Sequence, residues 1–143
     1  LEATGVRLAL ENLPTWETLP TEMEMEQIHQ RFPSDRIGYW HDIGHGRIRE
    51  NMGFVNSLHW LNRLRDCLFG MHLHDVAPPA QDHLMPGFGH ISFAAYRPLI
   101  RSDIPLVIEP SPGTPDADVR AGLALLQQQW MDPPEAETNG TPT

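Results

Sequence analysis

Four side chains that can bind a metal recur along the chain at nearly equal intervals. They are Glu11, Asp42, His72 and Glu109, and the intervals between them are 31, 30 and 37 residues. About 30 residues is the length of one strand-plus-helix unit. Three carboxylates brought together without a cation would repel one another, and each would take up a proton or move away. Three carboxylates and one imidazole form a suitable ligand set for one divalent ion, such as Mn, Mg, Co or Zn.

The elements that must position these side chains are indicated by four short apolar runs, at residues 6–10, 37–40, 68–73 and 104–108. Each has the length of a strand, and none alternates with polar residues, as expected for strands covered on both faces. Helix starts are indicated between and after the runs at four places: Thr21, Ser57, Ser92 and Thr114. Thr21 can form a capping box with Glu24, and Thr114 is followed by Pro115. Strands alternating with helices predict a parallel sheet with helical crossovers.

In a parallel sheet the carboxyl ends of all strands lie at one edge, where α/β proteins build their sites. We therefore expect the four candidate ligands to meet there. Strand alternation predicts that His41 points away from its neighbour Asp42, toward the helices.

Length and composition narrow the class of protein. The 143 residues are 40% hydrophobic and 20% charged, which suits one folded domain. A net charge of −9 argues against a protein that binds nucleic acid through its phosphates. No apolar run approaches the roughly 20 residues of a membrane span. Cys67 is the single cysteine, so we expect a reducing, cytoplasmic location. Residues 132–143 lack apolar periodicity, and this absence predicts a disordered tail.

Five segments, taken in order, resemble the later half of the xylose-isomerase-like barrels. They are LALEN (8–12), HDIGH (41–45), MHLHD (71–75), DHLMPGFGHISF (82–93) and LVIEP (106–110). That superfamily contains sugar isomerases and epimerases, inosose dehydratases and apurinic endonucleases, and its fold is a (β/α)8 TIM barrel of roughly 250 residues. The resemblance implies an α/β fold over residues 1–131 that corresponds to the C-terminal half of the barrel, strands five to eight with their helices.

The resemblance also implies roles for individual residues. Glu11, Asp42, His72 and Glu109 become the ligands of one divalent metal ion, and Glu11 and Glu109 also become the acid/base pair of an isomerase or epimerase. His45 and His83 match positions that contact substrate or, in the nuclease branch, bind a further metal. The implied reaction is proton transfer next to the carbonyl of a sugar or sugar phosphate, through an enediolate.

Three departures from the family pattern bear on the alternatives. The nuclease pattern has an acid two residues before His83, where this chain has Gln81. This difference weakens the hypothesis of a multi-metal nuclease. Phe88 stands where relatives often carry Glu, and His74 stands where many carry Lys. Asp75 is a candidate supporting partner for the ligands.

The alternatives to an isomerase or epimerase are an apurinic-type, phosphodiester-cleaving endonuclease and a non-catalytic metal- or sugar-binding remnant.

A half barrel on its own would have two open strand edges and an uncovered apolar inner face. We therefore expect the 143-residue chain alone to be a poor enzyme and a poor monomer. Activity should require the N-terminal half barrel, from the same chain or from a partner, and self-association is the other way to cover the exposed surface.

Overall fold

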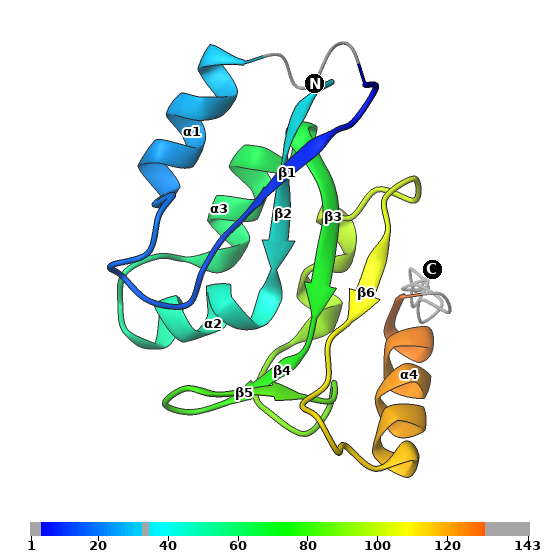
Figure 1. Ribbon diagram of the computed structural model, residues 1–143. Helices are drawn as coiled ribbons and strands as arrows, with labels where there is room; N and C mark the ends of the chain where they lie inside the picture. The colour runs from blue at the N-terminus through cyan, green and yellow to red at the C-terminus, as the bar shows by residue number, and fades with distance from the viewer. Residues whose placement is uncertain (1–3, 33–34, 131–143) are drawn as a thin grey trace, which may run out of the picture.

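A parallel sheet of four strands organises the chain (Figure 1). The computed structural model describes residues 4–32 and 35–130. The strands lie in the order β1 (Leu8–Glu11), β2 (Ile37–Asp42), β3 (Leu68–Leu73) and β6 (Leu106–Ile108). All three pairings are parallel, as the sequence predicts. The last strand begins later than expected, because Pro105 has no N–H to donate, and only its carbonyl joins the sheet, by accepting from the N–H of Met71.

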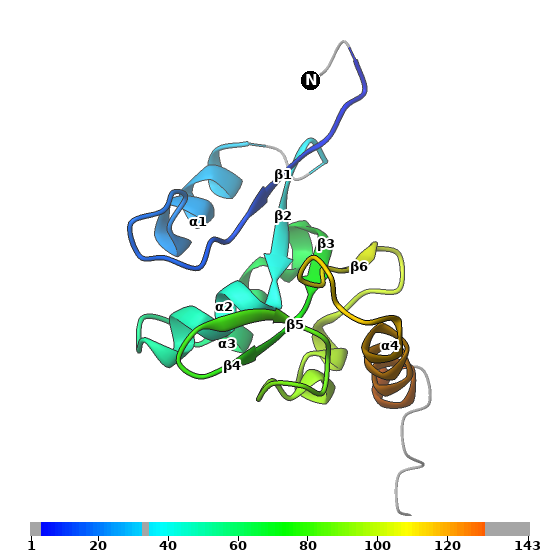
Figure 2. The same ribbon diagram turned by 60° about the horizontal axis from the view of Figure 1, so that its bottom comes forward.

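The helices gather on one side of this sheet. They are α1 (Glu22–Arg31), α2 (Ile43–Asn51), α3 (Ser57–Leu64) and α4 (Asp116–Trp130). Figure 2 shows the sheet curving, with its opposite face free of any helix from the described residues. The apolar core lies between sheet and helices and includes Tyr39, Leu61, Met71 and Phe93, all almost completely buried. The uncovered face is the one that points into the interior of a closed barrel.

Two helix starts agree with the sequence closely. At the start of α1 the Thr21 hydroxyl accepts from the N–H of Glu24, while the Glu24 carboxylate accepts from the N–H of Thr21. This is the expected capping box. Helix α4 begins at Asp116, directly after Pro115.

Other elements differ from expectation. The N-cap of α3 is Asn56 rather than Ser57, because the Ser57 hydroxyl is buried against His41 and Tyr96. The helix expected after Ser92 consists instead of two short 3₁₀ turns, Phe93–Ala95 and Arg97–Leu99, because Pro98 cannot continue a helix.

Helix α2 and a two-stranded antiparallel hairpin, β4 (Asp75–Ala77) with β5 (Gln81–Leu84), were not expected. Both lie at the carboxyl ends of the sheet strands (Figure 1). The expected tail at 132–143 lies outside the described residues, so that expectation stays a prediction. None of the helices in the described part of the chain is long and apolar enough to cross a membrane.

Candidate active site

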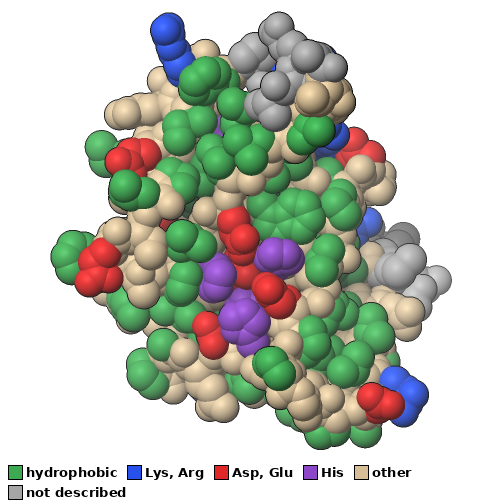
Figure 3. Space-filling model, in the orientation of Figure 1, with side chains coloured by type: hydrophobic (Ala, Val, Ile, Leu, Met, Phe, Trp, Pro, Cys, Tyr) green, Lys and Arg blue, Asp and Glu red, His purple; other side chains and the backbone are tan. Residues whose placement is uncertain are grey.

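The carboxyl ends of the four parallel strands bring the predicted metal ligands together. Side chains alternate between the two faces of a strand, and the register pairs Glu11 with Trp40, and His72 with both Asp42 and Val107. These residues therefore share the inner face. Figure 3 shows carboxylates and imidazoles gathered at the centre of that face, with apolar side chains around them.

The imidazole of His72 lies at the middle of this cluster. Its Nδ1 is 3.0 Å from Glu11 Oε1, 3.3 Å from Glu109 Oε2 and 3.6 Å from Asp42 Oδ2. The nearby Asp42 carboxylate raises the pKa of His72 to about 9; burial opposes this rise, and Glu11 and Glu109 add to it. Without a cation, a protonated His72 supplies the positive charge that the three carboxylates require.

Asp42 is the most enclosed member of the cluster, with its carboxylate fully buried. Its Oδ1 accepts from the N–H of His45 at 2.7 Å, and this hydrogen bond caps α2. The same oxygen lies 2.9 Å from His74 Nε2. Its Oδ2 has no hydrogen-bond partner among the described residues. Burial alone would raise the pKa of Asp42, but the imidazoles of His72 and His74 hold it well below its usual range.

An ionised oxygen that is buried and unpartnered is costly unless something positive compensates it. Asp42 Oδ2 lies 3.6 Å from both His72 Nδ1 and His45 Nδ1, and a cation bound beside it would supply the partner that it lacks among the described residues. Two triads that include Asp42, one with Glu11 and His45 and one with His74 and Glu109, have candidate ligand atoms within 4.8 Å of one another. Carboxylates together with imidazoles are a ligand set that suits a divalent ion, although neither triad includes His72.

Asn12 ties β1 to β2 at the site, a role the sequence did not indicate. Its Nδ2 donates to the carbonyl of Asp42 at 2.9 Å, and its Oδ1 accepts from the N–H of Asp42 at 2.8 Å. Its own carbonyl accepts from His45 Nδ1 at 2.9 Å. Because a carbonyl can only accept, His45 carries a proton on Nδ1. In the sequence, the only indication that Asn12 lies near the site was its position next to Glu11.

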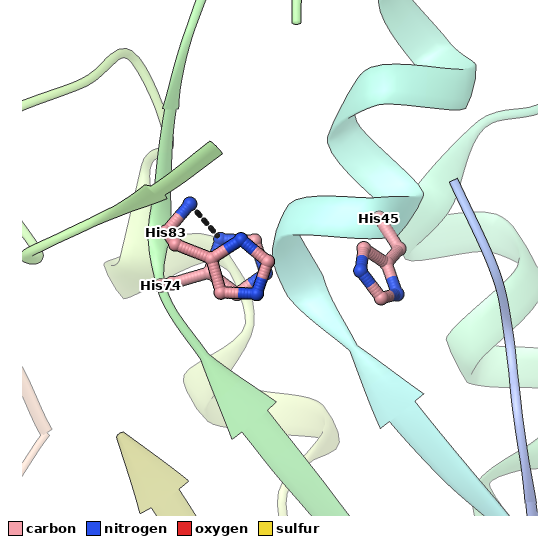
Figure 4. A group of neighbouring side chains, drawn as sticks. All are labelled: His45, His74 and His83. Carbon is pink, nitrogen blue, oxygen red and sulfur yellow. Dashed lines mark hydrogen bonds between the residues drawn. The ribbon is translucent and has the colours of Figure 1, made fainter. Parts of the chain in front are cut away.

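The two histidines expected to contact substrate come from different elements and lie at the same site. His45 stands in the first turn of α2, and His83 stands in β5, with ring centroids 6.1 Å apart (Figure 4). His83 Nε2 is 3.8 Å from Glu109 Oε2, so His83 borders the ligand cluster. His41 faces the helices and is buried, as strand alternation predicts.

Asp75 supports the loop at the rim of the site rather than the ligands themselves. Its buried carboxylate accepts four backbone N–H bonds of 2.8–2.9 Å, from Val76, Gly87, Gly89 and Ile91. A side chain at Gly89 would not fit, because its Cβ would lie 2.4 Å from Asp75 Oδ1. The loop presents Phe88 with half of its surface exposed.

Trp40 provides an apolar surface next to the ligands. Its six-membered ring packs directly over Gly70, and the indole meets the His72 ring at a centroid distance of 5.1 Å and an angle of 63°. An aromatic face beside polar ligands suits a substrate with both C–H and hydroxyl surfaces.

Comparison with known proteins agrees with this architecture. The family model described as xylose isomerase-like TIM barrel matches residues 1–129, so the chain belongs to that family. Among solved structures, the crystal structure of a D-tagatose 3-epimerase-like protein superposes with a TM-score of 0.69 at 20% sequence identity. The match covers 92% of this chain and 49% of that one, so the chain spans about half the length of this relative. No curated protein sequence matches the chain. The predicted fold, one half of a TIM barrel, is confirmed.

Proposed function

We propose that the chain carries the catalytic half of a divalent-metal-dependent sugar isomerase or epimerase. The observation that carries this proposal is the convergence of Glu11, Asp42 and Glu109 on His72, with Asp42 Oδ2 buried and unpartnered among the described residues. These four residues would hold the ion, whether Mn, Mg, Co or Zn. When bound, such an ion would supply Lewis-acid polarisation of a sugar carbonyl and stabilisation of the negative charge that develops on it.

The two glutamates are the residues best placed to move protons. The side chains of Glu11 and Glu109 are 30% and 42% exposed, whereas that of Asp42 is inaccessible. They extend from β1 and from the end of β6, the two outer strands, and so approach the site from opposite sides. One can remove the proton beside the carbonyl and the other can return it, at the opposite face or at the neighbouring carbon.

The remaining side chains would orient the substrate. His45 uses Nδ1 to donate to the Asn12 carbonyl, which leaves Nε2 as the nitrogen that would meet a sugar hydroxyl, and His83 lies beside Glu109. The Trp40 indole offers its apolar face to the C–H groups of the sugar. An enediolate would then form among polar groups, with the Trp40 indole on one side.

The substrate we favour is an unphosphorylated sugar. TIM barrels often bind phosphate in the loops after strands seven and eight, which here follow β3 and β6. Those loops carry Asp82, Glu109 and, at the start of α4, Asp116 and Asp118. The sequence contains no lysine. Two arginines between β3 and β6 are already engaged, Arg97 with the Trp130 carbonyl and Arg101 with Asp103.

A further half barrel is the partner that the uncovered inner face requires. We propose that it comes from the same polypeptide or from an associated one, with a second copy of this chain as the alternative. The single thiol of Cys67, buried in the structure, is compatible with the cytoplasm, where we place the enzyme.

Two measurements test the proposal. Calorimetric titration of the chain with Mn²⁺ should show one ion bound, because all four ligands belong to this chain. Proton transfer is then tested in D₂O with the full-length gene product and a panel of free ketoses. Deuterium should enter the carbon next to the carbonyl, and Glu11→Gln or Glu109→Gln should abolish this. The exposed Glu17→Gln serves as the control.

The alternatives predict other results. Ion binding without deuterium incorporation into any sugar would indicate a non-catalytic remnant. Cleavage of abasic DNA that is lost in moderate salt would indicate the endonuclease.

A further inference from the structure

His74 contacts two parts of the candidate site at once. It is completely buried, and its Nε2 lies 2.9 Å from Asp42 Oδ1, a close electrostatic contact rather than a well-formed hydrogen bond. Its Nδ1 accepts from the backbone N–H of His83 at 2.9 Å, as Figure 4 shows. Because Nδ1 accepts, the proton of the neutral ring is on Nε2, where it faces the carboxylate. His74 therefore links a candidate metal ligand to a candidate substrate residue.

The surrounding backbone is shaped to admit this ring. A Cβ on Gly44, in the first turn of α2, would lie 1.9 Å from His74 Cε1, so glycine is required there. His83 has a φ of 54°, a left-handed conformation that is uncommon for a residue with a side chain. In that conformation its N–H donates to His74 Nδ1. Unusual backbone of this kind persists where the surrounding structure fixes it, and it clusters at functional sites.

A second metal ion is the obvious alternative use of these residues. His45, His74 and His83 do have nitrogen atoms within 4.8 Å of one another. However, the rings of His74 and His83 are parallel within 5° and stacked at a centroid distance of 4.2 Å (Figure 4). An ion about 2.1 Å from an imidazole nitrogen lies close to the ring plane, and two parallel planes share no such point. Both nitrogens of His74 also already face other groups. The stacked pair therefore cannot chelate one ion.

We propose that His74 is a positioning residue whose two nitrogens have separate tasks. The electrostatic contact of Nε2 with Oδ1 fixes the Asp42 carboxylate so that Oδ2 is directed toward the cation, and Nδ1 fixes His83 at the rim of the substrate site. This inference rests on the proposed function for the identity of cation and substrate. The contacts themselves are independent of it.

Two substitutions separate the tasks. A glutamine side chain places its amide near the position of Nε2, so His74→Gln keeps a donor for Asp42 and loses the acceptor for His83. An asparagine places its amide near Nδ1, so His74→Asn does the reverse. Removing a group that orients a metal ligand weakens metal affinity by about 10- to 100-fold. We expect that loss for Mn²⁺ in His74→Asn and a much smaller change in His74→Gln. His59→Gln, on the exposed side of α3, is the matched control.

Nuclear magnetic resonance supplies readouts that need neither metal nor activity. The ring ¹⁵N shifts of His74 should show the Nε2–H tautomer. The amide resonance of His83 should move in His74→Gln and stay near its original position in His74→Asn. The opposite tautomer, or equal loss of Mn²⁺ affinity in both variants, would overturn the inference. The inference would also be overturned if the chain bound two Zn²⁺ ions and both variants bound only one. If the chain binds no cation at all, the proposed function fails, while the tautomer and the His83 amide still decide the role of His74.

Discussion

Acid should destabilise the fold through His41, which is 1% exposed on the helix-facing side of β2. The Tyr39 hydroxyl donates to Asn12 Oδ1 at 3.0 Å, so its oxygen accepts from His41 Nδ1 at 2.7 Å. On the other side of the ring, Nε2 accepts from the Ser57 hydroxyl at 3.4 Å, and Ser57 accepts from Tyr96 at 3.1 Å. The neutral ring with its proton on Nδ1 satisfies every one of these hydrogen bonds. A protonated ring would remove the lone pair on Nε2 that accepts from the Ser57 hydroxyl, and the Ser57 O–H would lose this acceptor.

The size of the effect follows from the pKa of His41. Burial lowers this pKa from 6.5 to about 4, although the charge of Asp42 partly opposes the shift. Since the folded pKa lies below the unfolded one, the unfolded chain takes up the proton first. The stabilisation is therefore complete above about pH 6.5 and is lost as the pH falls toward 4. The gap corresponds to about 3 kcal/mol, a large part of the total stability of an ordinary domain.

Urea unfolding followed by tryptophan fluorescence, at several pH values between about 7 and 4, measures this loss. Other groups titrate in the same range, so the quantity to compare is the difference between the original chain and His41→Gln. That difference should shrink by about 3 kcal/mol across the range. A histidine ring titration by nuclear magnetic resonance covers the case in which the variant folds poorly, and its midpoint for His41 should lie near 4. Parallel pH profiles together with a midpoint near 6.5 would refute the reasoning.

Three further predictions concern the site. Asp42→Asn should abolish Mn²⁺ binding in calorimetry while Glu17→Gln leaves it intact, because only the first removes a buried ligand charge; unchanged binding in both would rule out the ion site. Asp75→Asn should lower the free energy of unfolding in urea by at least about 3 kcal/mol, since four backbone donors lose their charged acceptor; a loss below about 1 kcal/mol would contradict this. Gly44→Ala should cost about 1–3 kcal/mol by forcing the His74 ring aside, and the double variant with His74→Ala should recover most of it; no recovery would show that the two positions are not coupled.

The spacing of ligand-capable residues was enough to predict which side chains would lie close together. Glu11, Asp42 and His72 follow the strand-plus-helix period, and a parallel sheet converts that period into proximity at one edge. The start of α1 was also predictable, because a capping box depends only on residues near one another in sequence. These features are local or periodic, so a single sequence reveals them.

The features that were missed depend on contacts between distant segments. Helix α2 contains Gly44 and Gly46, which have low helix propensity, and it forms because Asp42 caps it and His74 packs against it. The cap of α3 moved to Asn56 because Ser57 bonds to groups elsewhere in the chain. Asn12 bonds to the backbone of a strand 30 residues away, and no local pattern in the sequence could indicate that partner.

The four hydrogen bonds to Asp75 have a consequence for how the site would meet a ligand. Loops that close over a substrate come from the least stable parts of a fold, where backbone hydrogen bonds open readily. The loop that carries Phe88 is different, because the N–H groups of Gly87 and Gly89 on either side of it end on one buried carboxylate. Its backbone has little conformational entropy left to lose, so a ligand resting on it avoids most of the ordering cost of binding. Adaptation to ligands of different shape then falls to the exposed Phe88 ring, which can change rotamer while its backbone stays fixed.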